Sequence, residues 1–289
     1  MKQSILIIGS DEKWEERALL AEAEKQMLEA RFIMAGDVTV FLDENRARLF
    51  YGDEEITELF YRSKIIFRRT RGAMDKMFVL ANLADSGHQA VYTDSVQSIM
   101  NNLNKVHSMH LAITKHIRHI PTVFVINGQE FDIKAFGLSL PLVIKPACGR
   151  HGEGVIFVED QQTLNKTLAD NNQSVLVQKA LDIKREYRIF VVGGKCLGVI
   201  EKIPEEGSRV ANYAAGAEFR QAEIPEQYIQ DAVEICRQEK IDIGGVDIAF
   251  ADDHYYLLEV NRCPEFKAFN KATGIDVSKE IIYFISQKA

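Results

Sequence analysis

Apolar and polar positions change their pattern along the chain, and the first hundred residues follow one scheme. The run SILIIG (4–9) is continuously apolar, which predicts a buried strand, and residues 14–30 follow it with helical spacing. The same pattern predicts a strand at 64–69, a helix at 74–87 that a glycine ends, and a short strand at 89–93. Strands that alternate with helices predict a parallel α/β layer.

Short alternating runs predict antiparallel hairpins. Residues 38–43 and 46–52 form such a pair around Asp-Glu-Asn, and residues 186–203 form another around Gly193-Gly194. The run GGVDIAFADDHYYLLEVN (244–261) predicts a third hairpin. Strands are also predicted at 122–126, 141–146, 154–159 and 174–181.

Helical spacing recurs in the rest of the chain. Residues 101–116 predict a helix that Asn101 or Asn102 caps. Two further helices are predicted at 162–171 and at 225–240, the second with a proline at its start. The fold class is therefore α/β followed by α+β.

Composition excludes several classes of protein. The 289 residues include 35 basic and 42 acidic side chains, so the net charge of −7 gives no basic footprint for nucleic acid. The four cysteines form no C-x-x-C pair, which argues against a zinc knuckle or a disulfide framework and favours reduced thiols. No apolar run is long enough to span a membrane, and the apolar run at the N-terminus is too short for a signal peptide. These features predict a cytoplasmic protein.

A glycine-rich loop separates two predicted strands in VIKPACGRHGEGVIFVE (143–159). Gly149, Gly152 and Gly154 allow backbone N–H groups to approach an anion, and Lys145 beside them supplies a charge for phosphate. The place of the loop between strands argues against a Rossmann fingerprint or a P-loop. A purely structural glycine turn is the alternative.

The hairpin 244–261 carries oxygen donors among apolar residues. Alternation places Glu259 and Asn261 on one face. Asp247 joins them if the loop spans 252–254, so that Ala251 pairs with Tyr255. Two carboxylates and an amide oxygen are typical ligands of a hard cation such as Mg²⁺, and a polar solvent face is the alternative.

Arginines end the strand predicted at 64–69. Arg68, Arg69 and Arg71 in FRRTRG could clamp a substrate carboxylate, because guanidinium groups bind carboxylates through two hydrogen bonds. A solvated loop is the alternative. The segment QKAL (178–181) is by itself a plain core strand, and the pairs of histidines at 107–110 and 116–119 have no metal-ligand spacing and are interpreted as solvated.

The order of these segments resembles the ATP-grasp superfamily, and within it the RimK-type carboxylate–amine ligases. Nearly the whole chain takes part: a lysine on a helix, IKP before a glycine loop, VQKAL, REYRIFVVGG, and GGVDI with LEVN. The resemblance implies a pre-grasp α/β domain over 1–100, a central ATP-grasp subdomain over 101–184 and a C-terminal subdomain with the magnesium site over 185–289.

The resemblance also implies the groups that hold the cofactors, ATP and Mg²⁺, with Mn²⁺ as a substitute for Mg²⁺. The metal ligands would be Asp247, Glu259 and Asn261. Contacts to the nucleotide would come from Lys105, Lys145, Gly149, Gly152, Gly154, Gln178, Lys179, Ala180 and Glu186.

Further residues are implied for the reaction itself. The catalytic set would be Lys202, Arg209 and Asn212, and the substrate-binding set Arg68, Arg71 and Arg188. Four segments depart from the family pattern: Arg209 is displaced by one residue in RVAN, Lys202 replaces an arginine, AAG stands at 214–216, and Arg-Cys-Pro-Glu follows Asn261. These departures fall on the acceptor side.

The reaction implied is amide formation through an acylphosphate, with release of ADP and phosphate. The partners would be small carboxylate and amine substrates or a peptide or protein acceptor, with glutamate as an example of the amino acid added. An enzyme that crosslinks peptides through esters or amides and a nucleotide-binding protein without turnover are the alternatives. A homodimer and a homotetramer are both compatible with the family.

Overall fold

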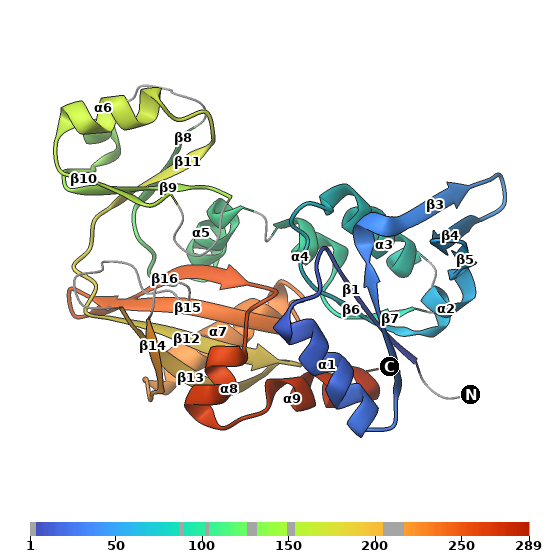
Figure 1. Cartoon of the computed structure of the whole chain (residues 1–289). Helices are drawn as coiled ribbons and strands as arrows, with labels where there is room; N and C mark the ends of the chain where they lie inside the picture. The colour runs from blue at the N-terminus through green and yellow to red at the C-terminus, as the bar shows by residue number, and fades with distance from the viewer. Residues whose placement is uncertain are drawn as a thin grey trace.

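A parallel sheet of order β2-β1-β6-β7 organises the N-terminal layer of the computed structural model, which describes residues 4–86, 90–101, 104–125, 132–148, 154–204 and 217–288 (Figure 1). Its strands are β1 (Ser4–Gly9), β2 (Glu29–Met34), β6 (Lys64–Phe67) and β7 (Val91–Tyr92). Its helices are α1 (Trp14–Lys25), α2 (Thr57–Arg62), α3 (Met74–Ser86) and α4 (Val96–Asn101). The predicted parallel α/β layer is confirmed.

The helix predicted over 14–30 is too long, because α1 ends at Lys25 and the chain enters β2 at Glu29. Met27 takes a left-handed φ of 58°. Leu28 N donates to Ala23 O at 2.9 Å and Met27 N to Glu24 O at 2.9 Å, which together form a Schellman ending. Methionine carries no sequence signal for this turn, since glycine is the usual residue there.

The predicted hairpin at 38–52 is confirmed and projects from the N-terminal layer (Figure 1). It consists of β3 (Val38–Leu42) and β4 (Ala47–Tyr51), and β5 (Glu54–Glu55) adds a third strand. The short 3-10 helix η1 (Ala35–Asp37) leads into it.

The central sheet is antiparallel and has the order β10-β9-β11-β8. Its strands are β8 (Thr122–Val125), β9 (Leu142–Pro146), β10 (Ile156–Val158) and β11 (Val175–Lys179). The helices η2 (Ile133–Phe136) and α6 (Gln161–Ala169) lie within this segment, and α5 (Lys105–Thr114) precedes it. Ile144 and Val177 pair and belong to the core that Leu164 of α6 completes, so the neighbouring Lys145 and Leu176 face the opposite side.

The predicted cap of α5 is wrong at Asn101, and Asn102 lies outside the described residues. Asn104 caps the helix, since its side chain accepts from Val106 N at 2.9 Å. Asn101 ends α4 instead. The asparagines at 101, 102 and 104 look alike in the sequence, and only the start of α5 at Lys105 shows which of them is the cap.

The third sheet has the order β14-β13-β12-β15-β16. Its strands are β12 (Arg185–Val192), β13 (Lys195–Ile203), β14 (Glu218–Gln221), β15 (Ile243–Ala251) and β16 (His254–Asn261). The Gly193-Gly194 turn is confirmed, with φ angles of 56° and 75°. Helix α7 (Glu226–Gln238) covers one face, where Ile235 packs with Val246 and Tyr187 in one core.

One core joins the N-terminal layer to the third sheet. It contains Ile7 of β1, Phe190 of β12 and Ile281 of α9 (Val277–Gln287). Helix α8 (Lys267–Thr273) lies before α9, and α9 returns beside α1 (Figure 1). Lys64 Nζ of β6 donates to Ser286 O at 2.8 Å, which fastens the end of α9 to the N-terminal sheet. Strands β1 and β6 are thereby held close to the third sheet.

Within the described ranges, no helix is long and apolar enough to cross a membrane.

Candidate active site

A row of charged side chains lies on the face of the third sheet opposite α7. Residues paired across neighbouring strands share a face, and the register pairs Glu186 with Lys202, Arg188 with Asp247, and Asp247 with Glu259. Four strands, β12, β13, β15 and β16, therefore bring five charged side chains to one surface. The sequence prediction that Asp247 and Glu259 share a face is confirmed.

Asp247 is the centre of a buried ion-pair cluster. Arg188 Nε and Nη2 donate to its Oδ1 and Oδ2 at 2.7 and 2.8 Å, and Lys202 Nζ donates to Oδ2 at 2.7 Å. Lys202 also pairs with Glu186. Asp247 is 2% exposed and Lys202 6%. Charges buried to this extent are tolerated because each has a hydrogen-bonded partner of opposite sign.

The pKa values in the cluster follow from burial and pairing. Burial alone would raise the pKa of Asp247, but Arg188 and Lys202 outweigh it and lower that pKa to about 2. For Glu186, burial dominates over the opposing effect of Lys202 and raises the pKa. Burial opposes the charged form of Lys202, yet Asp247 and Glu186 raise its pKa. Asp247 therefore remains a carboxylate at neutral pH.

The hairpin reaches its register by a route that differs from the predicted one. The predicted three-residue loop is wrong, because Ala251 pairs with His254 and only Asp252 and Asp253 form the turn. Both take left-handed φ angles, 49° and 59°, as a type I′ turn requires. A β-bulge at Leu258 then adds one residue to β16 and returns Glu259 to its place opposite Asp247.

The other two predicted metal ligands differ in their surroundings. The Glu259 carboxylate is half-buried, and no side-chain hydrogen bond or ion pair joins it to another residue of the described ranges. Asn261 Oδ1 accepts from Cys263 N at 2.9 Å. Glu259 thus presents free acceptor oxygens on the face that Asp247 shares.

These residues fit Mg²⁺ held jointly with phosphate oxygens and do not form a cage of their own. No group of three or more His, Cys, Asp or Glu residues in the described part of the chain is arranged to hold a metal ion alone. Mg²⁺ usually keeps several waters and takes one or two carboxylates plus the phosphates of a nucleotide. Asp247, Glu259 and the amide of Asn261 supply that kind of donor set.

Lys145 of β9 faces the carboxylates from the central sheet. Its burial lowers the pKa of the amine to about 8, Lys105 acts in the same direction, and Glu259 and Glu186 oppose the shift. The charges of the third sheet therefore act on a lysine of the central sheet. Lys105 N donates to Ala147 O at 3.0 Å, which ties the start of α5 to the end of β9 and brings the second lysine to the same place.

The glycine loop is described only at its last residue. Gly154 has a left-handed φ of 73°, and a Cβ atom there would lie 2.9 Å from Pro146 Cγ, so the backbone at Gly154 passes close to the end of β9. The residues Gly149, Gly152, Arg209 and Asn212 lie outside the described ranges, and their roles stay predictions.

The segment 178–181, which carries three of the predicted nucleotide contacts, leads from the central sheet toward the third sheet. Gln178 is buried and its Nε2 donates to Thr122 Oγ1 at 2.6 Å. Lys179 is exposed, with Nζ 3.8 Å from Asp252 Oδ2. Ala180 N already donates to Pro141 O at 3.1 Å. The nucleotide contacts of these three residues stay predictions, and the Gln178 side chain already has a partner within the protein, Thr122.

The prediction that Arg68 binds substrate is wrong, because its side chain is fully buried. Arg68 Nε donates to Glu16 Oε1 at 3.1 Å, and the neighbouring Arg69 pairs with both Glu15 and Glu16. The acidic pair at the start of α1 was the sequence signal for these partners. Arg71 is exposed in the next turn and remains available to a substrate carboxylate.

Sequence reasoning assigned no role to Arg262. This residue follows Asn261 and is 3% exposed. Its guanidinium donates to Phe67 O at 3.2 Å, Arg68 O at 2.5 Å and Asp94 Oδ2 at 3.1 Å. The only signal in the sequence was a bulky charged residue where the family pattern has a small one.

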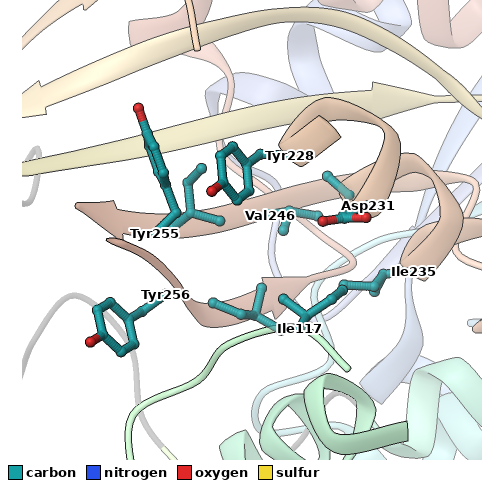
Figure 2. Close-up of a pocket in the computed structure, with 10 residues that line it drawn as sticks. Ile117, Tyr228, Asp231, Ile235, Val246, Tyr255 and Tyr256 are labelled. Atoms are coloured by element: carbon teal, nitrogen blue, oxygen red, sulfur yellow. The ribbon is translucent and has the colours of Figure 1, made fainter. Parts of the chain in front are cut away.

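An apolar pocket lies on the α7 face of the third sheet (Figure 2). Tyr228 and Asp231 of α7, Val246 of β15 and Tyr255 of β16 line it together with Ile117. Val246 and Asp247 are neighbours on a strand and point to opposite faces. This pocket is therefore separate from the charged row.

Comparison with known proteins matches this arrangement to one family. Residues 102–285 match the family model of the RimK-like ATP-grasp domain. A relative named probable alpha-L-glutamate ligase, from Enterobacter sp. (strain 638), is 30% identical over 163 residues, or 55% of this chain and 54% of that protein. Another of the same name, from Rhodopirellula baltica, is 25% identical and covers 93% of this chain and 67% of its own length. The chain thus spans about half the length of some of the curated relatives it matches.

Solved structures share the whole fold. The ATP-grasp ligase PsnB complexed with minimal precursor has a TM-score of 0.77 at 15% identity and covers 99% of this chain and 98% of its own. The macrocyclase MdnC from Microcystis aeruginosa, bound with precursor peptide MdnA, has a TM-score of 0.73 at 14% identity, with coverage of 99% and 100%. With a family model that matches well over half of its residues, the chain belongs to the RimK-like ATP-grasp family.

Proposed function

We propose that the protein is an ATP-dependent carboxylate–amine ligase that forms an amide through an acylphosphate and releases ADP and phosphate. The observation that carries the proposal is the position of Lys145 opposite the carboxylates of the third sheet. A lysine on one sheet and oxygen donors on another can hold a triphosphate and its metal between them. The solved structure of PsnB with Mg and ADP supports the same cofactors for this fold.

In the first step, a carboxylate oxygen of the substrate attacks the γ-phosphorus of ATP, and the bond to the β-phosphate oxygen breaks. Lys145 and Lys105 neutralise the charge on the phosphate oxygens. Asp247, Glu259 and Asn261 would hold Mg²⁺, which would supply charge stabilisation to the phosphate oxygens. Arg188 and Lys202 are held rigidly by Asp247, so their charges stay oriented toward this face.

In the second step, the amine nitrogen attacks the acyl carbon, phosphate leaves, and the nitrogen loses a proton. No nucleophilic side chain is needed, so the chain's task is to place two substrates and to exclude water. Arg71 would hold an acidic group of the substrate at the edge of the N-terminal sheet.

The substrate proposed is an amino acid such as glutamate, added to a small molecule, a peptide or a protein. The names of the relatives support this choice, since one is a ribosomal protein bS6–L-glutamate ligase from Escherichia coli that is 30% identical over 52% of this chain. PsnB and MdnC were solved with precursor peptides, which favours a peptide as acceptor.

A panel of acids, amines and peptides tests the proposal, with ADP and product measured in each mixture and Glu259→Gln as the inactive control. Acceptor-dependent ADP release with an amide product is the expected result. AMP as the nucleotide product would refute the acylphosphate route, and ATP binding without turnover by any pair would favour a nucleotide-binding protein.

Peptide crosslinking is the second candidate. Its support is the likeness to a macrocyclase and the unusual Arg-Cys-Pro-Glu segment after Asn261. Mass spectrometry separates the two candidates: a crosslinked peptide loses one water, whereas a ligated acceptor gains an amino acid residue.

A further inference from the structure

Two arginine side chains, one at each end, join the end of β16 to the end of β6 by hydrogen bonds to the backbone. Arg262, directly after Asn261, donates to the carbonyl oxygens of Phe67 and Arg68 at 3.2 and 2.5 Å. Arg68 in turn donates from Nη2 to Pro264 O at 3.3 Å. Each side chain therefore holds the backbone of the segment that carries the other.

Buried carboxylates fix both arginines. Asp94 Oδ2 accepts from Arg262 at 3.1 Å, while Asp94 Oδ1 accepts from Asp242 N at 2.8 Å at the start of β15. Glu16 of α1 accepts from Arg68 at 3.1 Å. Asp94 is 1% exposed and Glu16 is fully buried. A charged hydrogen bond of this kind is strong because water cannot compete for it.

The segments that this pair joins have different tasks in the proposed reaction. The end of β16 carries Glu259 and Asn261, and Cys263 N donates to Asn261 Oδ1, so a shift of the backbone at 262 reaches Asn261. In the N-terminal sheet, β1 and β6 are neighbours. The chain leaves β1 toward β2, which lies on the side of β1 away from β6. This is a topological switch point, and ligands of parallel sheets bind at the carboxyl ends of the strands there. Arg71 stands at that edge.

We propose that Arg262 is a positioning residue that sets the distance between the phosphate site on β16 and the edge of the N-terminal sheet where Arg71 stands. The inference rests on the proposed ligase function. Arg262 itself is buried and contacts neither substrate. By fixing this distance it keeps the two substrates aligned, so that the amine attacks the acylphosphate, and its loss lets water take the acyl group instead. The water then yields the starting acid and phosphate, so ATP is spent without amide formation.

The test compares Arg262→Lys with Arg237→Lys, a control at an exposed ion pair with Glu234 on α7. Lysine keeps the charge but loses the planar fork that reaches several acceptors at once. We expect MgATP affinity, measured by calorimetry, to stay within about twofold, and amide formed per ADP to fall about tenfold, the scale of a small misplacement of reacting groups. Arg237→Lys should leave both unchanged.

Arg68→Lys gives an independent measure if Arg262→Lys fails to fold, as thermal unfolding would show. It removes the Nη2 bond to Pro264 and keeps a cation for Glu16, and we expect the same loss of amide per ADP. An unchanged ratio in the folded variants overturns the positioning role while wild-type ligation stands. A wild-type enzyme that forms no amide with any acceptor overturns the proposed function and the positioning role together.

Discussion

Arg188 donates from Nε and Nη2 to the two carboxylate oxygens of Asp247, at 2.7 and 2.8 Å. The proposed metal ligand is therefore also the counter-ion of a buried guanidinium. Asp247 also accepts a hydrogen bond from Lys202, whose second partner is Glu186. Glu259, which faces it across the hairpin, has no such structural duty.

This difference predicts that Asp247→Asn and Glu259→Gln affect activity alike and stability differently. Both variants should abolish ADP release, since each removes charge from the proposed metal site. Asp247→Asn should also lower the free energy of unfolding by about 3–5 kcal/mol, because it leaves Arg188 buried without its carboxylate partner and Lys202 with Glu186 alone. Glu259→Gln should cost under about 1 kcal/mol, as for a substitution away from buried pairs. Urea denaturation measures both, and equal losses would contradict the role of Asp247 as counter-ion.

Lys145→Ala should weaken ATP binding more than Lys184→Ala. Lys145 faces Glu259 and Glu186 in the site, whereas Lys184 is 62% exposed and pairs with Asp182 on the surface. A charge-assisted contact in a partly buried site is worth about 1.5–3 kcal/mol, or roughly tenfold or more in Kd. Calorimetric titration with ATP gives both affinities, and equal values would remove Lys145 from the phosphate site.

The sequence pattern predicted those features of the fold that depend on a few neighbouring residues, such as strands, turns and the face a side chain occupies. Alternation gave the strands around Gly193-Gly194 and the shared face of Asp247 and Glu259, because side-chain period and turn chemistry act over a few residues. The pairing of Asp247 with Glu259 was predicted correctly, but from a three-residue turn. The turn has two residues, which shifts the pairing by one position, and the extra residue in the bulge at Leu258 shifts it back. A bulge has no sequence signal in a run such as YYLLEVN.

The roles of residues whose partners are distant in the sequence could not be predicted from such local rules. Arg68 was predicted to bind substrate, because an arginine at the end of a strand looks the same whether it faces solvent or Glu16, 52 positions earlier. Arg262 drew attention only as a departure from a pattern, since its acceptors at Phe67, Arg68 and Asp94 become neighbours only in the folded chain.

The β12–β13 turn provides a test of how the C-terminal helix packs. A Cβ atom on Gly193 would lie 2.4 Å from Cδ2 of Phe284 on α9, whereas one on Gly194 would meet nothing within 4 Å. Both glycines have left-handed φ angles, so alanine costs about 1–2 kcal/mol at either position. Gly193→Ala should lose about 1–3 kcal/mol more through the clash. Thermal unfolding of the two variants checks this, and equal Tm values would mean that α9 does not pack on the turn.

Arg71→Ala should raise KM for the acid substrate and leave ATP affinity nearly unchanged. Arg71 is exposed at the edge of the N-terminal sheet, and its neighbours Arg68 and Arg69 are occupied by Glu16 and Glu15. Loss of a bidentate contact to a carboxylate is worth roughly 1.5–3 kcal/mol, which corresponds to a rise of about tenfold or more. Steady-state kinetics with the acid varied decide the matter. Unaltered kinetics would refute the clamp and leave the ligase mechanism intact.

Lys145 should make ATP binding depend on pH near 8. Burial, assisted by Lys105, lowers the pKa of its amine to about 8, against the opposing effect of Glu259 and Glu186. Phosphate oxygens favour the charged form, so the pKa in the ATP complex must lie above that of the free enzyme. The bound state then holds more protons between these two pKa values, and ATP affinity falls as pH rises through 8, while below pH 7 the effect vanishes.

Calorimetry in two buffers of different ionisation enthalpy reports the protons taken up when ATP binds. At pH 8 about half of the free enzyme carries a neutral Lys145, so uptake of about half a proton is expected, and at pH 6.5 almost none from this group. Lys145→Arg is the matched control, since arginine stays charged throughout and should abolish the uptake. Equal proton uptake by the wild type and by Lys145→Arg at pH 8 would show that Lys145 does not contact the phosphates.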